Sequence, residues 1–206
     1  MRKLIGTFSL ALVCVMVLAA SSAPAKEPAK LKIGQAGPEW KDLIGVDGKR
    51  HSLGELKTKK AVVVCFTCNH CPVAKAYEDR LIKLAQDYKS KDVALVAINV
   101  NLGKSDSLPA MKERAEEKNF NFQYLFDPTQ EIGRQYFAAR TPEVFLLDAD
   151  RKLAYTGAVD DSMQVDGVKK HHLRDAIDAV LAGNEPETTT TRPHGCSIKY
   201  EKKSGG

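Results

Sequence analysis

The fold is decided by residues 61–72, AVVVCFTCNHCP, in which an apolar run leads through three cysteines to a proline. The run from Ala61 to Phe66 is rich in β-branched residues, which is typical of a strand covered on both faces. From Pro72 the apolar residues recur every three or four positions, at Val73, Tyr77, Leu81, Leu84 and Tyr88. This period predicts a helix, with Pro72 accommodated in its first turn. Cys68 is therefore expected at a strand-to-helix junction.

Outward from this junction, the chain alternates strand and helix patterns. A hairpin is expected across Asp47-Gly48, and a helix capped by Ser107 follows a second buried strand. Shorter patterns predict a final hairpin and a closing helix that ends at Gly183. The expected strands are 93–100, 122–126, 143–147 and 152–156, and the expected helices are 107–118, 129–137 and 173–181.

The cysteine spacing predicts a redox-active pair. Backbone N–H groups and the helix dipole at the junction would stabilise the thiolate of Cys68. Cys71 lies about one helical turn after Cys68, so its sulfur is within disulfide reach of Cys68 and is more shielded by the first turn of the helix. We therefore expect Cys68 to be the more acidic, accessible thiol that attacks, and Cys71 to resolve. A protonated His70 would favour the reduced form. A structural disulfide is the alternative, whereas an iron-sulfur cluster is disfavoured because Cys65 lies inside the strand.

A second candidate element is Thr141-Pro142, immediately before the predicted strand 143–147. A proline that opens a strand often carries a cis peptide bond. An ordinary trans proline at a strand entrance is the alternative interpretation.

Taken together, these motifs resemble the thioredoxin-like and redoxin superfamily, in particular its exported TlpA-like members and the alkyl hydroperoxide reductase/thiol-specific antioxidant group. The resemblance covers roughly residues 38–181 and includes Gly157. It implies a three-layer α/β fold with a central mixed sheet and an N-terminal hairpin. It also implies that Thr141 and Pro142 bind substrate beside the dithiol, that Asn69, His70 and Pro72 tune it, and that no organic cofactor is needed. Thr67 replaces the aromatic residue usual before the first cysteine.

Two other activities remain open. A peroxiredoxin-like peroxidase would use a PxxxTxxC motif, but position 64 is valine and position 68 is cysteine when the motif is placed on Cys71. A copper-binding thioredoxin-fold module could use His171 and His172 with the cysteines, although its CxxxC spacing is missing. We therefore expect thiol-disulfide exchange and no metal.

The ends of the chain predict export. Arg2 and Lys3 precede an apolar run that gives way to small residues before Ala25, which is typical of a cleaved signal peptide. The expected divisions are a signal peptide (1–25), a flexible leader (26–37), one redoxin domain (38–183) and a C-terminal arm (184–206). The protein would then be periplasmic or secreted, with no membrane span in the mature chain. The net charge of +5 is scattered along the sequence, so we expect protein or small-molecule thiols as partners, not nucleic acid.

The arm carries a fourth cysteine of the mature chain, Cys196. An exposed thiol in an exported protein is prone to oxidation, so a partner is expected. Four cysteines allow three pairings, which the sequence does not rank. We hypothesise that the arm folds back, so that Cys196 serves as a third redox thiol or a guard; an incidental surface thiol is the alternative.

Overall fold

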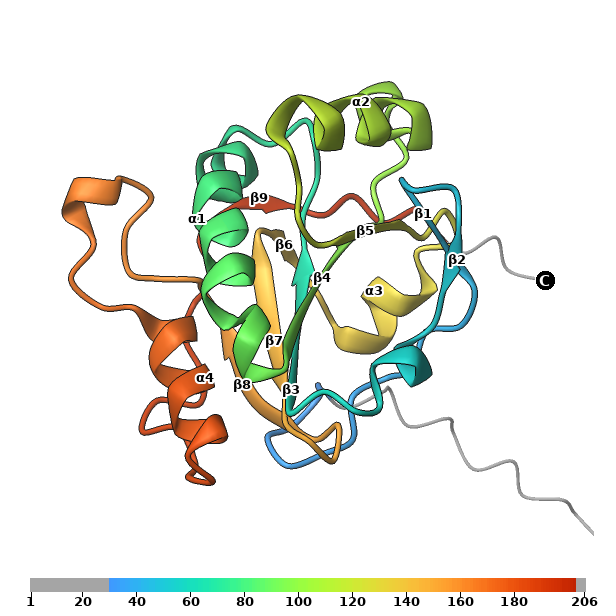
Figure 1. The fold of residues 1–206 in the computed structure, drawn as a ribbon. Coiled ribbons are helices and arrows are strands. Elements are labelled where there is room, and N and C mark those ends of the chain that lie inside the picture. The colour runs from blue at the N-terminus through green and yellow to red at the C-terminus, as the bar shows by residue number, and fades with distance from the viewer. Residues whose placement is uncertain (1–29, 203–206) are drawn as a thin grey trace, which may run out of the picture.

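A seven-stranded mixed sheet forms the centre of the computed structural model, which describes residues 30–202 (Figure 1). The strand order is β2-β1-β5-β4-β3-β7-β8. Strands β3, β4 and β5 run parallel, whereas β7 is antiparallel to both of its neighbours and β1 is antiparallel to β5. The strands are β1 (Leu43–Gly45), β2 (Arg50–His51), β3 (Ala61–Phe66), β4 (Val93–Asn99), β5 (Gln123–Phe126), β7 (Glu143–Leu147) and β8 (Leu153–Gly157). The predicted signal peptide lies outside the described residues.

Strand β3 has the bounds predicted from its apolar run, and all six of its residues are buried. It lies between β4 and β7, so both of its edges are hydrogen-bonded. Because side chains alternate along a strand, Val63 and Cys65 pack toward one layer, while Val62, Val64 and Phe66 pack toward the other.

Helices cover both faces of the sheet and complete the three-layer α/β fold expected from the sequence (Figure 1). On one face lie α1 (Pro72–Tyr88), α2 (Leu108–Lys118) and α4 (His172–Leu181). On the other face, α3 (Glu131–Tyr136) packs with the N-terminal segments. No helix within residues 30–202 is long and apolar enough to cross a membrane.

The N-terminal hairpin forms as predicted, with Gly48 in the left-handed region at φ 77°. The flexible leader, by contrast, is expected from the sequence to extend to residue 37, and this is wrong for its last residues. Gly34 donates a hydrogen bond to the carbonyl of Leu153, and Gly37 donates one to that of Arg151. Backbone pairing with the β7–β8 turn therefore orders this segment despite its lack of apolar periodicity.

The C-terminal arm also docks on the domain. Its strand β9 (Cys196–Ser197) pairs antiparallel with β6 (Arg140–Thr141), a short strand beside the main sheet. Upstream, Thr191 donates its backbone N–H to Thr156. Downstream, Ile198 is only 8% exposed and belongs to the core. The arm contains no helix in its described part, as expected, yet it is held at several points along its length.

Candidate active site

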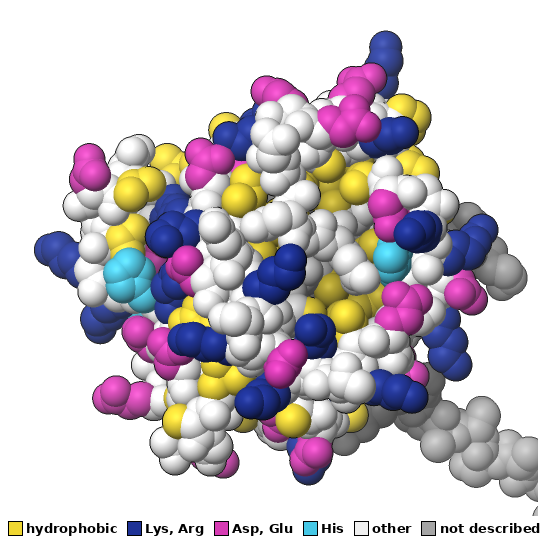
Figure 2. Space-filling view, viewed as in Figure 1, with side chains coloured by type: hydrophobic (Ala, Val, Ile, Leu, Met, Phe, Trp, Pro, Cys, Tyr) yellow, Lys and Arg dark blue, Asp and Glu magenta, His cyan; other side chains and the backbone are white. Residues whose placement is uncertain are grey.

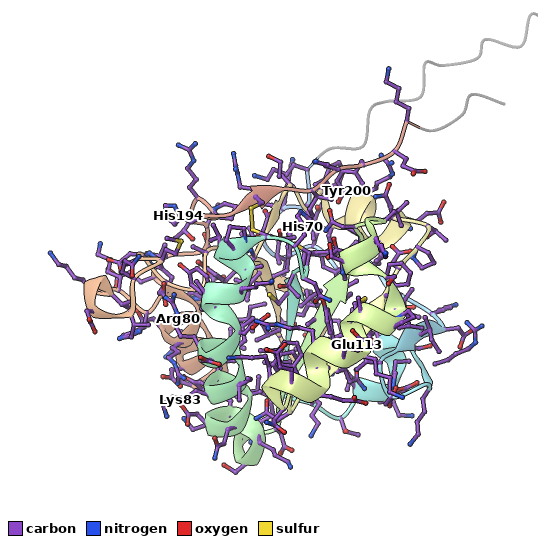
Figure 3. The ribbon with its side chains drawn as sticks, turned by 90° about the horizontal axis from the view of Figure 1, so that it is seen from above. His70, Arg80, Lys83, Glu113, His194 and Tyr200 are labelled. Carbon is purple, nitrogen blue, oxygen red and sulfur yellow. A yellow bond between two sulfur atoms is a disulfide. The ribbon has the colours of Figure 1, made fainter. Side chains whose placement is uncertain are left out.

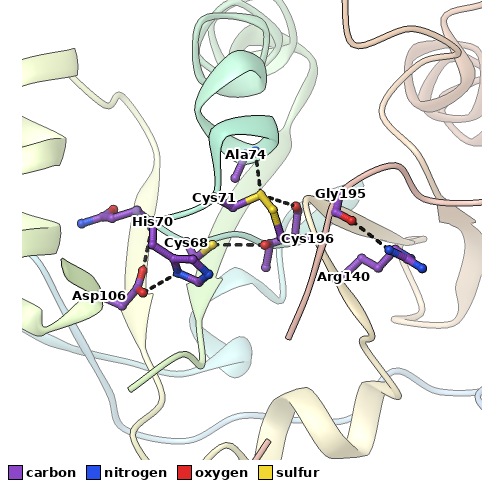
Figure 4. Close-up of a disulfide and its surroundings, with 10 residues drawn as sticks. Cys68, His70, Cys71, Ala74, Asp106, Arg140, Gly195 and Cys196 are labelled. Carbon is purple, nitrogen blue, oxygen red and sulfur yellow. Dashed lines mark hydrogen bonds and ion pairs between the residues drawn. A yellow bond between two sulfur atoms is a disulfide. The ribbon is translucent and has the colours of Figure 1, made fainter. Parts of the chain in front are cut away.

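The site is centred on the sulfur of Cys71, which caps the start of α1. Cys71 has an extended backbone, and its sulfur accepts the N–H of Ala74 at 3.4 Å (Figure 4). A disulfide joins it to Cys196, with 6.0 Å between the two Cα atoms and a sequence separation of 125. The link therefore ties the arm to the first turn of α1.

Cys68 is a free thiol in this arrangement. The predicted Cys68–Cys71 disulfide is thus not the state observed, and Cys71 is the sulfur that the two pairings share. The reason lies in the arm, because the register of β9 on β6 places Cys196 opposite Thr141. The carbonyl oxygen of Thr141 lies 3.3 Å from the sulfur of Cys71, so this register also brings Cys196 to Cys71.

The expectation that Cys68 is acidic and accessible is wrong in this structure. Cys68 is 2% exposed, and its sulfur lies 3.1 Å from the hydroxyl of Thr141. Burial raises the pKa of the Cys68 thiol, and the nearby carboxylate of Asp106 adds to this. The hydroxyl of Thr141 and the N–H groups of Cys71 and His70 oppose the rise without outweighing it. The helix begins at Pro72, after Cys68, so its N-terminus lies closest to Cys71.

Thr141 lies against both cysteines, and its peptide bond to Pro142 is cis. The loop that carries them is held by Glu143. One oxygen of this carboxylate accepts the N–H groups of Ala139 at 2.7 Å and Arg140 at 3.0 Å. Burial raises the pKa of Glu143.

Asp106 is a site residue that the sequence analysis missed. It ends a short 3-10 turn, η3 (Lys104–Asp106), and it is 1% exposed. Its carboxylate accepts the N–H of Asn69 at 2.7 Å and lies 2.6 Å from Nδ1 of His70 (Figure 4). Asn99, at the end of β4, donates its side-chain N–H to the same carboxylate. Asp106 therefore fixes the two residues between Cys68 and Cys71.

Cys68, His70 and Asp106 also form the one cluster of potential metal-ligating side chains within residues 30–202, with donor atoms within 4.8 Å of one another. The hydrogen bond between His70 and Asp106 already pairs two of these donors. His171 and His172 are not part of any such cluster in the described part of the chain. The arrangement therefore fits a hydrogen-bonded redox site better than a metal centre.

Replacing Asp106 by asparagine (Asp106→Asn) is expected to shift alkylation of Cys68 to lower pH. The carboxylate raises the pKa of Cys68 by charge repulsion, so removing its charge favours the thiolate. The rate of Cys68 alkylation by iodoacetamide, followed by mass mapping across pH, measures this shift. Asp79→Asn, at an exposed position of α1, is the matched control. An unchanged or upward shift would contradict the role assigned to Asp106.

The arm borders an open cavity of about 560 Å³ next to this site. It is lined by Arg140, by residues 192–195 of the arm and by the loop at Met163. Viewed from above, His70 lies at the same end of the molecule as His194 and Tyr200 of the arm (Figure 3). Neither this cavity nor a larger one, of about 710 Å³, has a cysteine in its lining, but the smaller one reaches Gly195, next to Cys196, and Val73, two residues after Cys71.

The fold and the buried sulfur cluster define a thioredoxin-like redox protein. Residues 32–172 match the profile of the Redoxin family, and the chain belongs to this family. No curated protein matches the chain. Membership of this family supports a redox enzyme in general.

Two solved structures are similar over most of their length. One is an uncharacterized conserved protein from Geobacillus kaustophilus, with 38% identity, a TM-score of 0.79, and coverage of 84% of this chain and 95% of that chain. The other is a hypothetical protein from Sinorhizobium meliloti 1021, with 33% identity, a TM-score of 0.79, and coverage of 86% and 98%. A putative thiol:disulfide interchange protein DsbE from Chlorobium tepidum shares the fold at 24% identity and a TM-score of 0.61, over 74% of this chain and 99% of that one.

Proposed function

We propose that this protein is an exported thiol-disulfide oxidoreductase in which Cys68 and Cys71 form the working dithiol. One observation carries the proposal: Cys71 is disulfide-bonded at the start of α1, with a free thiol three residues before it in the same buried cluster. A sulfur in this position is a good leaving group, because the N–H of Ala74 and the helix N-terminus stabilise its thiolate.

The exchange proceeds through mixed disulfides. In the direct route, the thiolate of Cys68 attacks a partner disulfide and releases one partner thiolate. Cys71 then attacks the sulfur of Cys68, which releases the second partner thiol and leaves a Cys68–Cys71 disulfide. Reversing these steps oxidises a partner dithiol. Since Cys68 is buried and Cys196 packs against its cluster, the direct route requires the arm to move.

Partners of this chemistry are protein or small-molecule thiols and disulfides. Acidic and basic side chains intermingle on the face seen in Figure 2, which gives no support to a nucleic-acid partner on that face. Export to the periplasm or the cell exterior, where disulfides persist, is part of the proposal and rests on the N-terminal sequence.

The test is turnover of insulin disulfides by the mature chain, together with the reduction potential of its cysteines. We expect turnover in the wild-type protein and its loss in Cys68→Ser. A high potential would assign the protein to disulfide formation, and a low one to reduction. Wild-type protein that exchanges no disulfide under either oxidising or reducing conditions would refute the proposed function.

Peroxide is expected to oxidise the protein slowly in comparison with disulfides. The proline and threonine of the peroxidase motif are replaced by Val64 and Cys68, so the side chains that assist peroxide in that motif are missing. The guanidinium of Arg140 donates to the carbonyl of Gly195 at 2.9 Å, so this cation is engaged by the arm. Competition kinetics between hydrogen peroxide and a small disulfide measure the difference. Peroxide oxidation much faster than that of an ordinary thiol would favour the peroxiredoxin-like alternative.

A further inference from the structure

The three sulfurs of the site differ in their access to solvent. Cys68 is 2% exposed and Cys71 is fully buried, whereas Cys196 is partly exposed. Cys71 is bonded to Cys196 and shares a buried cluster with Cys68 (Figure 4). A large partner therefore meets Cys196 before it meets either cysteine of the dithiol.

The arm holds Cys196 in place through its backbone. Thr141 pairs with Cys196 and Arg140 with Ser197 in the β6–β9 ladder. The N–H of Ile198 continues the ladder by donating to the carbonyl of Ala139 at 2.9 Å. This ladder fixes the position of Cys196 independently of the disulfide.

Gly195 is required for this approach. A Cβ added at Gly195 would collide with the carbonyl oxygen and carbon of Thr141. The φ of Gly195 is not among the positive values, so the close contact, and not backbone conformation, excludes a side chain here. At Gly195, the residue before Cys196, the backbone of the arm therefore packs directly against β6.

The arm is also anchored on both sides of Cys196. Upstream, the hydroxyl of Thr191 accepts the N–H of Ala158 at 2.9 Å. Downstream, the side chain of Gln130 donates to the carbonyl of Lys199 and accepts the N–H of Glu201, and the hydroxyl of Tyr200 donates to the carbonyl of Ala138. Opening the disulfide would therefore leave the Cys196 thiol beside Cys71, at the high effective concentration of a tethered group.

We propose that Cys196 is the relay thiol through which redox equivalents pass between external partners and the buried Cys68–Cys71 pair. This relay rests on the proposed function and identifies Cys196 as the cysteine with which external partners react first. Cys196 is then a third catalytic cysteine, and the disulfide in the structure is an intermediate of the relay.

The steps balance as three thiol-disulfide exchanges. The thiolate of Cys196 attacks a partner disulfide, forms a mixed disulfide and releases the first partner thiolate. The thiolate of Cys71 attacks the sulfur of Cys196, which releases the second partner thiolate and forms the observed Cys71–Cys196 disulfide. The thiolate of Cys68 attacks Cys71, forms the Cys68–Cys71 disulfide and frees Cys196. The partner disulfide gains two electrons, the protein loses two, and the protons of the attacking thiols pass to solvent and to the partner thiolates.

Trapping distinguishes the relay from direct attack. In the Cys71→Ser full chain, reduced and then mixed with insulin, the first mixed disulfide is not resolved by Cys71. The relay predicts that peptide mapping finds insulin linked to Cys196, whereas direct attack predicts linkage to Cys68. Linkage to Cys68 would overturn the relay and leave the proposed function intact.

Turnover gives a second, independent test. Without Cys196, insulin must react directly with the buried dithiol, and the advantage of a tethered thiol, of the order of a hundredfold or more, is lost. Cys196→Ser is therefore expected to slow insulin turnover by roughly a hundredfold. Gly195→Ala retains the thiol but blocks its approach to Thr141, so it should slow turnover as well. Gly54→Ala, where a Cβ meets nothing within 4 Å, is the matched control.

Gly195→Ala and Cys196→Ser distinguish a relay thiol from an arm that only shields the dithiol. If the arm only shields the dithiol, Gly195→Ala and Cys196→Ser should turn over insulin as fast as the wild-type protein or faster. That result, obtained with an active wild-type protein and control, would refute the relay alone. An inactive wild-type protein would instead refute the proposed function.

Discussion

Replacing Cys71 by serine (Cys71→Ser) is expected to abolish disulfide turnover. Its sulfur is the one that both possible disulfides share, since it is bonded to Cys196 and lies in the same cluster as Cys68. A hydroxyl at this position forms no disulfide, so neither resolution step can occur. Catalytic groups that act as a unit lose nearly all activity when one is removed, so we expect a loss of the order of a hundredfold or more. Insulin reduction under a dithiol reductant measures it.

The matched control for this variant is Cys65→Ala. Cys65 is buried like Cys71, but it is a free thiol within β3, and burial raises its pKa to about 12. Its removal should leave turnover close to that of the wild-type protein. If Cys71→Ser retained the wild-type rate, Cys68 or Cys196 would have to act without Cys71 as the resolving thiol, and the dithiol mechanism would be wrong.

The junction between β3 and α1 could be predicted because its determinants are local. The run of β-branched residues, the helical period after Pro72 and the proline before β7 each specify structure within a few residues. For this reason the bounds of β3 and the start of α1 agree with the sequence. The N-terminal hairpin was predictable on the same grounds, from the turn preference of Asp47-Gly48.

The chemistry of Cys68 could not be predicted locally, because its pKa depends on burial. The sequence shows the N–H groups at the junction but not the burial of Cys68, and the resulting desolvation makes the largest contribution to its pKa. Asp106 was missed for a related reason, since it lies 36 residues from His70 in the sequence. One signal was present: Asp106 follows a parallel strand adjacent to β3, and the carboxyl ends of parallel strands meet at one edge of a sheet.

The docking of the arm was only partly predictable. The expectation that it folds back came from its length and its lone cysteine, whereas its register on β6 was not foreseen. The sequence does carry a strand signal, because Cys196, Ile198 and Tyr200 alternate with Ser197 and Lys199. Ile198 accordingly enters the core. The run of threonines before it made this short strand-like alternation hard to recognise in the sequence.

Reducing the Cys71–Cys196 disulfide is expected to lower the stability of the protein substantially. The crosslink closes a loop of 125 residues, and the loss of chain entropy in the unfolded state is worth about 4.7 kcal/mol for a 100-residue loop. For a domain of this size, each kcal/mol shifts Tm by about 2–4 °C. We therefore expect dithiothreitol to lower the Tm of the wild-type protein by roughly 10 °C or more, measured by calorimetry or circular dichroism.

The control for this measurement is Cys196→Ser, which lacks the long crosslink under all conditions. Any Cys68–Cys71 disulfide that replaces it closes a loop of only a few residues, and the entropy gained from so short a loop is smaller. The Tm of this variant should thus change much less on reduction and lie near that of the reduced wild-type protein. A wild-type Tm that does not respond to dithiothreitol would mean that the arm is held by β9 and Ile198 alone, and that the disulfide adds little to stability.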